Sequence, residues 1–174
     1  MATTQTGTQR SQTPETQTQK ITTFLWYDGN AEEAVNFYTS VFKNAKIHNT
    51  VLYGESGPGA KGSVMLIEFE LAGQQFTAIN GGPEFKFTEA ISLVVHCQTQ
   101  EEVDHYWEKL VEGGGQHVEC GWLKDKYGLA WQITPDIFLE LLRTSDEKKK
   151  DRVMKAMMKM KKLDIKQIQE AAKG

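Results

Sequence analysis

The chain has 174 residues, enough for one ordinary domain and too few for a large multidomain enzyme. Hydrophobic residues make up 39% and charged residues 25% of it, so it can build an apolar core beneath a polar surface. The net charge of -3 lacks the basic excess of a general nucleic-acid binder, and no apolar run approaches the roughly 20 residues that a membrane span needs. With two cysteines and no apolar signal segment, we expect reduced thiols, a cytoplasmic location, and neither nucleic acid nor membrane as a partner.

Residues 1–20 are rich in Thr and Gln and contain almost no apolar side chain. Such a segment cannot bury enough surface to offset the entropy of ordering it, so we expect a disordered tail. A mitochondrial presequence is a weaker alternative. It would be rich in arginine, whereas here Arg10 and Lys20 are the basic residues and Glu15 is acidic.

A first group of elements is predicted over residues 21–80. The β-branched and aromatic run 21–27 predicts a strand. Asn30 then offers a helix cap with a glutamate at the third helical position, and apolar residues follow at helical spacing as far as Phe42. Three further strands, separated by Gly-rich turns, are predicted at 45–53, 63–71 and 74–80. The predicted order is βαβββ.

The same order follows over residues 91–134. A strand at 91–96 precedes a helix capped by Thr99, and three short strands are predicted at 117–121, 122–126 and 129–134. The two helices align at a constant offset of 69 residues, so that Asn30 corresponds to Thr99. We infer an internal duplication and expect one domain over 21–134, built from two tandem modules at about 21–82 and 88–134.

The remaining residues, 135–174, predict a helical extension with helices at 136–142, 146–161 and 165–172. The last two helices are rich in Lys and Met. This composition fits either a basic partner-binding helix or an arm that packs on its own domain or on a dimer mate. We favour the packed arm, because Met commonly fills irregular contacts.

Polar side chains stand among aliphatic ones on one face of several predicted strands. Because side chains alternate along a strand, Thr23 shares a face with Tyr27, and Ser92 shares one with His96. Such a face suits a sheet curved around a small ligand, although the same groups could face solvent or bond to one another beneath a loop. The hypothetical ligand pocket is lined by Thr23, Tyr27, Thr77, Ser92, Trp122 and Gln132.

Four segments carry a family resemblance: LWYDGNAEEA (25–34), VNFY (35–38), CGW (120–122) and DKYGLAWQITP (125–135). With the paired modules, they resemble the vicinal oxygen chelate superfamily of glyoxalase I, bleomycin-resistance proteins and extradiol dioxygenases. More narrowly, the chain looks like its PhnB-like branch, often labelled 3-demethylubiquinone-9 3-methyltransferase, over about residues 20–172. The resemblance implies an α+β fold in which two βαβββ modules form a cupped eight-stranded mixed sheet, here with added C-terminal helices. It also implies a homodimer, often completed by strand or module exchange.

Metal-dependent members of that superfamily place His or Glu at four positions, on the first and last strand of each module. By the alignment above, these positions hold Thr23, Thr77, Ser92 and Gln132. Hydroxyl and amide groups are poor ligands for Zn²⁺ or Fe²⁺, so we expect no metal and no cofactor. A rival ligand set is disfavoured because neighbouring strand residues point to opposite faces; it comprises His96, Cys97, His117 and Cys120.

Two functions stay open. The first is metal-free binding of a small organic ligand, such as an aromatic or quinone-like molecule. The second is an enzyme of the same fold, with His96 as the candidate acid/base, or with methyl transfer or glyoxalase-like or dioxygenase-like chemistry. The methyltransferase hypothesis rests on the family label, because no Gly-x-Gly-x-Gly turn follows a strand. Turns 57–59 and 81–83 could cradle phosphate, but a hairpin turn and a linker explain them better.

Overall fold

The computed structural model describes residues 19–174, so nearly all of the tail predicted for residues 1–20 lies outside the described residues. Module 1 confirms the predicted order βαβββ. It consists of β1 (Thr23–Tyr27), α1 (Ala31–Val41), β2 (Ala45–Leu52), β3 (Val64–Leu71) and β4 (Gln74–Asn80).

Module 2 has the same order with shorter strands: β5 (Ser92–Cys97), α2 (Gln100–Lys109), β6 (Gln116–His117), β7 (Trp122–Lys124) and β8 (Ala130–Pro135). The strand predicted at 117–121 is reduced to β6. Cys120 and Gly121 have positive φ angles of 59° and 81°, which an extended strand does not accommodate.

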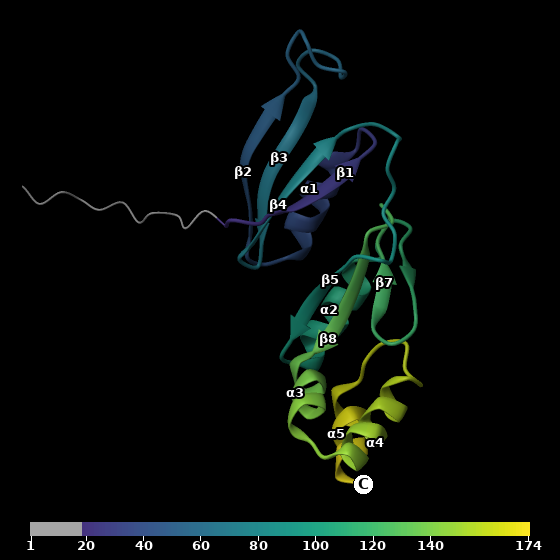
Figure 1. Cartoon of the computed structure of the whole chain (residues 1–174). Coiled ribbons are helices and arrows are strands. Elements are labelled where there is room, and N and C mark those ends of the chain that lie inside the picture. Colours follow the sequence, from purple (N-terminus) through teal and green to yellow (C-terminus); the bar gives the residue numbers. More distant parts are fainter. Residues whose placement is uncertain (1–18) are drawn as a thin grey trace, which may run out of the picture.

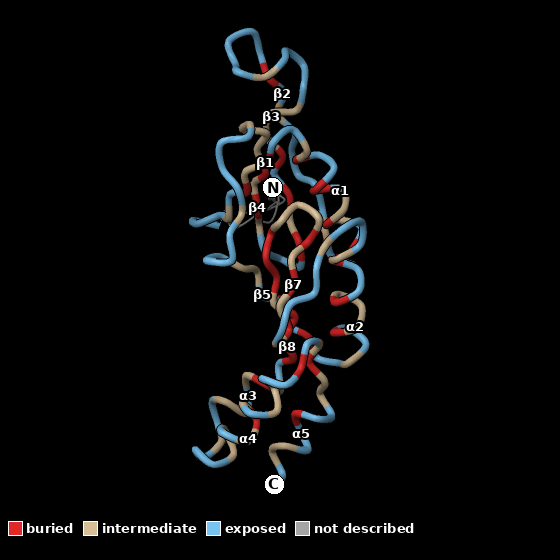
Figure 2. The backbone as a smooth tube through the Cα atoms, turned by 90° about the vertical axis from the view of Figure 1, so that its right-hand side faces the viewer, coloured by how far each residue is buried: buried red, intermediate tan, exposed pale blue. Residues whose placement is uncertain are grey.

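Each module forms its own four-stranded sheet, in the orders β1-β4-β3-β2 and β5-β8-β7-β6. The eight predicted strands are thus present as two sheets, and the first and last strands of each module run parallel (Figure 1). Helices α1 and α2 lie on the same side of the two sheets (Figure 2). We call this the helix side, and the opposite one the open side.

The register of the parallel pairs decides which side each residue of β1 and β5 faces. Thr23 pairs with the buried Phe76, and Leu93 pairs with the buried Trp131. Phe76 and Trp131 hold corresponding positions in the last strands, so Thr23 corresponds to Leu93 and not to Ser92. The first strands are therefore offset by 70 residues, one more than the helices.

The helix offset of 69 residues, applied to the first strands, would make Tyr27 equivalent to His96, and this one-residue difference shows that they are not. The connection between β1 and α1 is one residue longer than that between β5 and α2. Tyr27 and Thr23 consequently face the helix side, whereas His96 and Ser92 face the open side. Asn30 is the N-cap of α1, as predicted, but its side chain makes no capping hydrogen bond, and the first amide of the helix, that of Ala31, donates to Asn80 Oδ1 at 2.8 Å.

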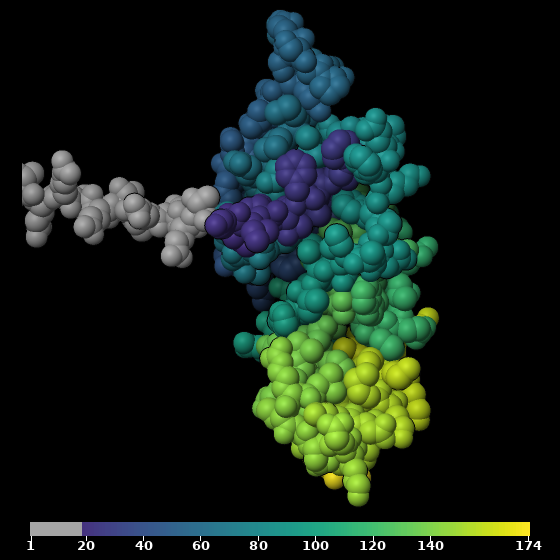
Figure 3. All heavy atoms as spheres, viewed as in Figure 1, coloured from purple at the N-terminus to yellow at the C-terminus, as the bar shows by residue number. Residues whose placement is uncertain are grey.

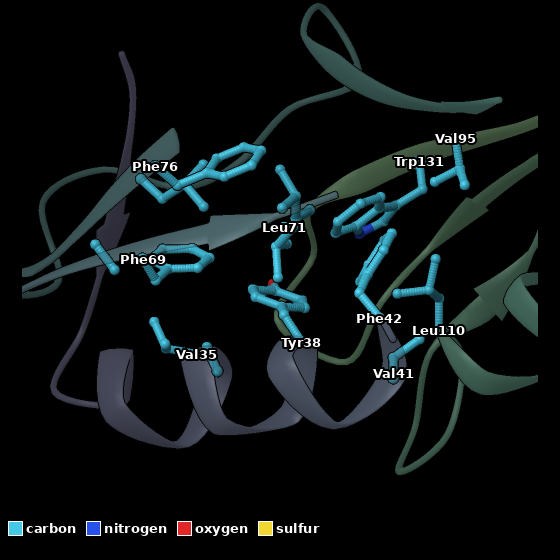
Figure 4. Close-up of a cluster of buried hydrophobic side chains, with 14 of the residues drawn as sticks. Val35, Tyr38, Val41, Phe42, Phe69, Leu71, Phe76, Val95, Leu110 and Trp131 are labelled. Carbon is cyan, nitrogen blue, oxygen red and sulfur yellow. The ribbon is translucent and has the colours of Figure 1, made fainter. Parts of the chain in front are cut away.

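One apolar core continues through both modules. Val35 and Tyr38 of the amphipathic α1 point toward Phe69 and Phe76 of the sheet (Figure 4). Just beyond α1, the Phe42 ring lies 5.7 Å from the ring of Trp131 in β8, centroid to centroid. This packing holds the two modules together.

The extension carries α3 (Asp136–Thr144), α4 (Glu147–Met157) and α5 (Ile165–Lys173). These helices share a second core, and the extension also docks on module 2. The amides of Cys120 and Gly121 donate to the carbonyls of Met160 and Lys161, at 2.8 and 2.7 Å. The Met- and Lys-rich segment therefore packs on its own domain. Across residues 19–174, every helix is too short or too polar to cross a membrane.

Candidate functional site

A cavity of about 520 Å³ lies between the free edge of β5 and module 1, and we call it the inter-module cavity. Its volume is within the range of small-molecule sites. Its walls carry four aromatic residues, two hydroxyl residues and one histidine, namely Phe42, Phe76, Tyr106, Trp131, Thr23, Ser92 and His96.

Three predicted site residues, Thr23, Ser92 and His96, therefore meet at this cavity. Gln132 supports one of them, because its Nε2 donates to Ser92 Oγ at 2.8 Å. Since Ser92 accepts that bond, its own hydroxyl proton stays available for a ligand. Trp122 pairs with Gln132 across β7 and β8, so it lies on the same open side but beyond the cavity lining.

His96 contacts a residue that the sequence analysis missed. Its Nδ1 lies 3.1 Å from Oδ1 of Asp136, the first residue of α3, and both side chains are about half exposed. The parallel register of β5 and β8 places Cys97 beside Pro135, which brings the flanking His96 and Asp136 together. The sequence did contain a signal for this contact, because Asp136 follows directly after the final strand of module 2.

Two other predicted site residues lie elsewhere. Tyr27 is buried, with its hydroxyl 3.1 Å from that of Tyr38, and burial raises its pKa well above the usual value for tyrosine. Thr77 faces the open side of module 1 and lines a smaller hollow of about 270 Å³ with His48 and Glu68. The structure does not bring Tyr27 or Thr77 to the inter-module cavity.

The DKYG segment, 125–128, builds a buried polar network. Asp125 Oδ2 accepts hydrogen bonds from the Tyr38 hydroxyl at 2.8 Å and the Trp131 indole at 2.9 Å. Its Oδ1 accepts from the backbone amides of Tyr127 and Leu129, at 2.9 and 3.0 Å. Burial nevertheless raises the pKa of Asp125. The segment therefore joins module 2 to module 1, a role the sequence analysis did not foresee.

The positions at which the superfamily holds a metal do not fit one here. Thr23 and Thr77 face opposite sides, and the open-side pairs across the parallel strands are Phe24 with Thr77 and Val94 with Gln132. Phenyl, isopropyl, hydroxyl and amide groups are poor ligands for transition metals. Within residues 19–174, no group of three His, Cys, Asp or Glu is placed to hold an ion.

The rival ligand set is dispersed among other contacts. His96 bonds to Asp136. The His117 ring stacks on the Trp107 ring with 4.3 Å between centroids, and the Nε2 of His117 lies 2.9 Å from the backbone carbonyl oxygen of Trp107. Burial raises the pKa of the Cys97 thiol to about 12, which favours the neutral thiol over the metal-binding thiolate.

The two turns considered as phosphate cradles, 57–59 and 81–83, pack against aromatic rings. The Cα atoms of Gly57 and Gly59 lie against the ring of Tyr53, and Gly81 lies against the indole of Trp26, so a side chain at any of the three would collide with the ring. The Trp26 indole also donates to the carbonyl of the glycine after Gly81, at 2.9 Å. These contacts fit the hairpin-turn and linker interpretation.

Comparison with known proteins agrees with this architecture. Residues 19–134 match the family described as 3-demethylubiquinone-9 3-methyltransferase. The PhnB protein from Bacillus cereus is 44% identical, with a TM-score of 0.61 over 67% of this chain and 99% of its own. A search among curated proteins found no match.

Two more distant structures share the fold. One is a protein from Pseudomonas aeruginosa, 19% identical with a TM-score of 0.57 over 67% of this chain and 97% of its own. The other is the fosfomycin resistance protein FosX from Listeria monocytogenes, solved with Mn(II) and sulfate. It is 17% identical, with a TM-score of 0.50 over 72% of this chain and 96% of its own. With both modules matched, the chain belongs to the PhnB-like 3-demethylubiquinone-9 3-methyltransferase family of the vicinal oxygen chelate superfamily.

Proposed function

We propose that this protein binds a small aromatic or quinone-like molecule in the inter-module cavity, that it does so without a metal ion, and that it works as a homodimer. The cavity itself carries the proposal: about 520 Å³ of space walled by four aromatic rings, with hydroxyl groups among them. A concave, mostly apolar site with a few polar groups is the usual form of a small-molecule site.

The contacts of the wall residues suggest what each offers a ligand. The Trp131 indole is buried and its N–H is bonded to Asp125, so Trp131 closes the apolar wall. Tyr106 is partly exposed and offers its ring surface for stacking. Ser92 offers a hydroxyl proton, since its oxygen already accepts from Gln132. A planar ring carrying a hydroxyl or carbonyl oxygen would satisfy both groups at once.

Exposed apolar side chains beside two free strand edges support the homodimer. β1 and β5 are edge strands. β1 is accessible at the surface of the molecule (purple in Figure 3). Phe24 and Val94 on these strands are 55% and 44% exposed, and the nearby Ile21 and Ile91 are 83% and 72% exposed. Unpaired edges flanked by apolar groups attract a further strand, and a second copy there would also wall the cavity along β5.

The ligand-binding proposal can be tested with 1-naphthol, a two-ring compound with one hydroxyl. We expect calorimetric binding together with quenching of tryptophan fluorescence. Ser92→Ala should weaken binding about 2- to 10-fold, the worth of one neutral hydrogen bond. Thr77→Ala removes a hydroxyl outside the cavity and should leave the affinity unchanged. Absence of binding, or equal losses in both variants, would refute this use of the cavity.

A second candidate, an enzyme that uses the same cavity, is favoured by the contact between His96 and Asp136. An imidazole held by a carboxylate is a common acid/base arrangement. Methyl transfer, which the family description names, would need S-adenosylmethionine. Calorimetry with S-adenosylmethionine separates methyl transfer from simple acid/base chemistry. Lyase or oxygenase chemistry of the metal-dependent kind is disfavoured by the donor set described above.

A further inference from the structure

His96 and Asp136 lie on opposite sides of a boundary in the chain. The family match ends at residue 134, so His96 belongs to the matched modules, whereas Asp136 is the second residue beyond them. The carboxylate that contacts the cavity histidine therefore comes from the start of the C-terminal extension.

The position of Asp136 is fixed from both directions. β8 passes into α3 without a loop, and Pro135 at the junction is fully buried and pairs with Cys97. Two residues after Asp136, Phe138 is buried in the core of the extension. The main chain at Asp136 is thus held by sheet pairing before it and by helix packing after it.

The contact determines which nitrogen of His96 carries a proton. An ionised carboxylate only accepts hydrogen bonds, so the nitrogen 3.1 Å from Asp136 Oδ1 must be Nδ1–H. In the neutral ring, Nε2 then holds the lone pair and is the basic nitrogen. Ser92, four residues earlier on the same side of β5, lines the same cavity.

We propose that Asp136 is a positioning residue that holds His96 in the Nδ1–H form, so that Nε2 takes a proton from the hydroxyl of a hydroxy-aromatic ligand. The O–H bond breaks, its electron pair stays on the ligand oxygen, and a new N–H bond forms on Nε2. The resulting imidazolium lies beside the Asp136 carboxylate. The identity of the ligand rests on the proposed function; the positioning role does not.

Nitrogen-15 NMR of the full-length protein reports the protonated nitrogen directly. Spectra are recorded at a pH above the end of any observed titration of the ring, so that the neutral form is observed, and His96→Gln assigns the signal. We expect the wild type to show Nδ1–H, and Asp136→Ala to shift His96 toward the Nε2–H form that free histidine prefers. Asp136→Asn keeps an acceptor oxygen and should restore Nδ1–H. Glu140→Gln, which removes an exposed carboxylate one turn later in α3, is the matched control and should change nothing.

A wild-type Nε2–H ring, or the same tautomer in wild type and Asp136→Ala, would overturn the positioning role. Thermal unfolding of each variant confirms that the fold is intact, and because the start of α3 is packed on both sides we expect small changes. Binding of 1-naphthol is measured separately. A wild type that binds 1-naphthol but lacks the Nδ1–H preference rejects this inference alone. A wild type that shows the preference but does not bind 1-naphthol rejects the ligand proposal alone.

Discussion

The carboxylate of Asp125 accepts a hydrogen bond from the hydroxyl of Tyr38, a residue 87 positions earlier in the chain. The 2.8 Å contact crosses from module 2 to module 1, and both groups are buried. A buried carboxylate is costly unless its oxygens are bonded, so Asp125 is tolerated only while the modules are docked.

Removing the Tyr38 hydroxyl should therefore destabilise the fold. Tyr38→Phe leaves one bond fewer on a buried carboxylate, and we expect the free energy of unfolding in urea to fall by about 1–3 kcal/mol. Tyr127→Phe is the matched control, because the Tyr127 hydroxyl donates to Glu33 at the surface and its loss should cost less than about 1 kcal/mol. Equal losses in the two variants would contradict the importance assigned to the buried network.

The raised pKa of Asp125 predicts a pH dependence of stability. The folded pKa lies above the unfolded one, so the contribution of this group is fully present below the unfolded pKa of about 3.9 and is lost as pH rises through the folded pKa. We expect the stability of the wild type relative to Asp125→Asn to fall over that range and then level off. Urea titrations of both proteins across pH measure the difference. An increase with pH would show that hydrogen bonding outweighs burial at this carboxylate.

The contact between the extension and module 2 predicts a sharp glycine requirement. A Cβ at Gly121 would lie 2.9 Å from the Ile133 carbonyl oxygen and 3.0 Å from Leu163, at a φ of +81°. Gly73 has a similar φ of +87° with open space around it. Gly73→Ala should therefore cost about 1–2 kcal/mol for the left-handed backbone, and Gly121→Ala about 1–3 kcal/mol more for the collision. Similar melting temperatures for the two variants would mean that Leu163 of the extension moves aside to make room for the added methyl group at residue 121.

The proposed dimer can be tested by placing charge on the open side. Phe24→Lys and Val94→Lys should convert a dimer to a monomer in size-exclusion chromatography with light scattering, because a buried unpaired charge opposes association. Leu52→Lys alters a residue that is 53% exposed on β2, at the far edge of the sheet, and should leave the mass unchanged. A monomeric wild type, or a dimer in all three variants, would refute this interface.

The sequence predicted the element order because the strands and helices of each module carry strong periodic patterns. It did not predict which side of β1 faces the helix, because alternation defines two faces without saying which one is covered. One extra residue before α1 was enough to misassign Thr23 and Tyr27. The contact of His96 with Asp136 depends on the parallel pairing of β5 with β8, and such long-range register is not contained in local patterns.

The parallel pairing of first and last strands also sets the order in which the chain can complete its structure during synthesis. β1 is made first but finds its partner only when β4 has emerged, so each module stays open until its final strand arrives. In module 2, that final strand continues directly into Asp136. The histidine of β5 therefore gains its sheet neighbour and its carboxylate within a few residues of translation, and a chain that stops before β8 has neither in place.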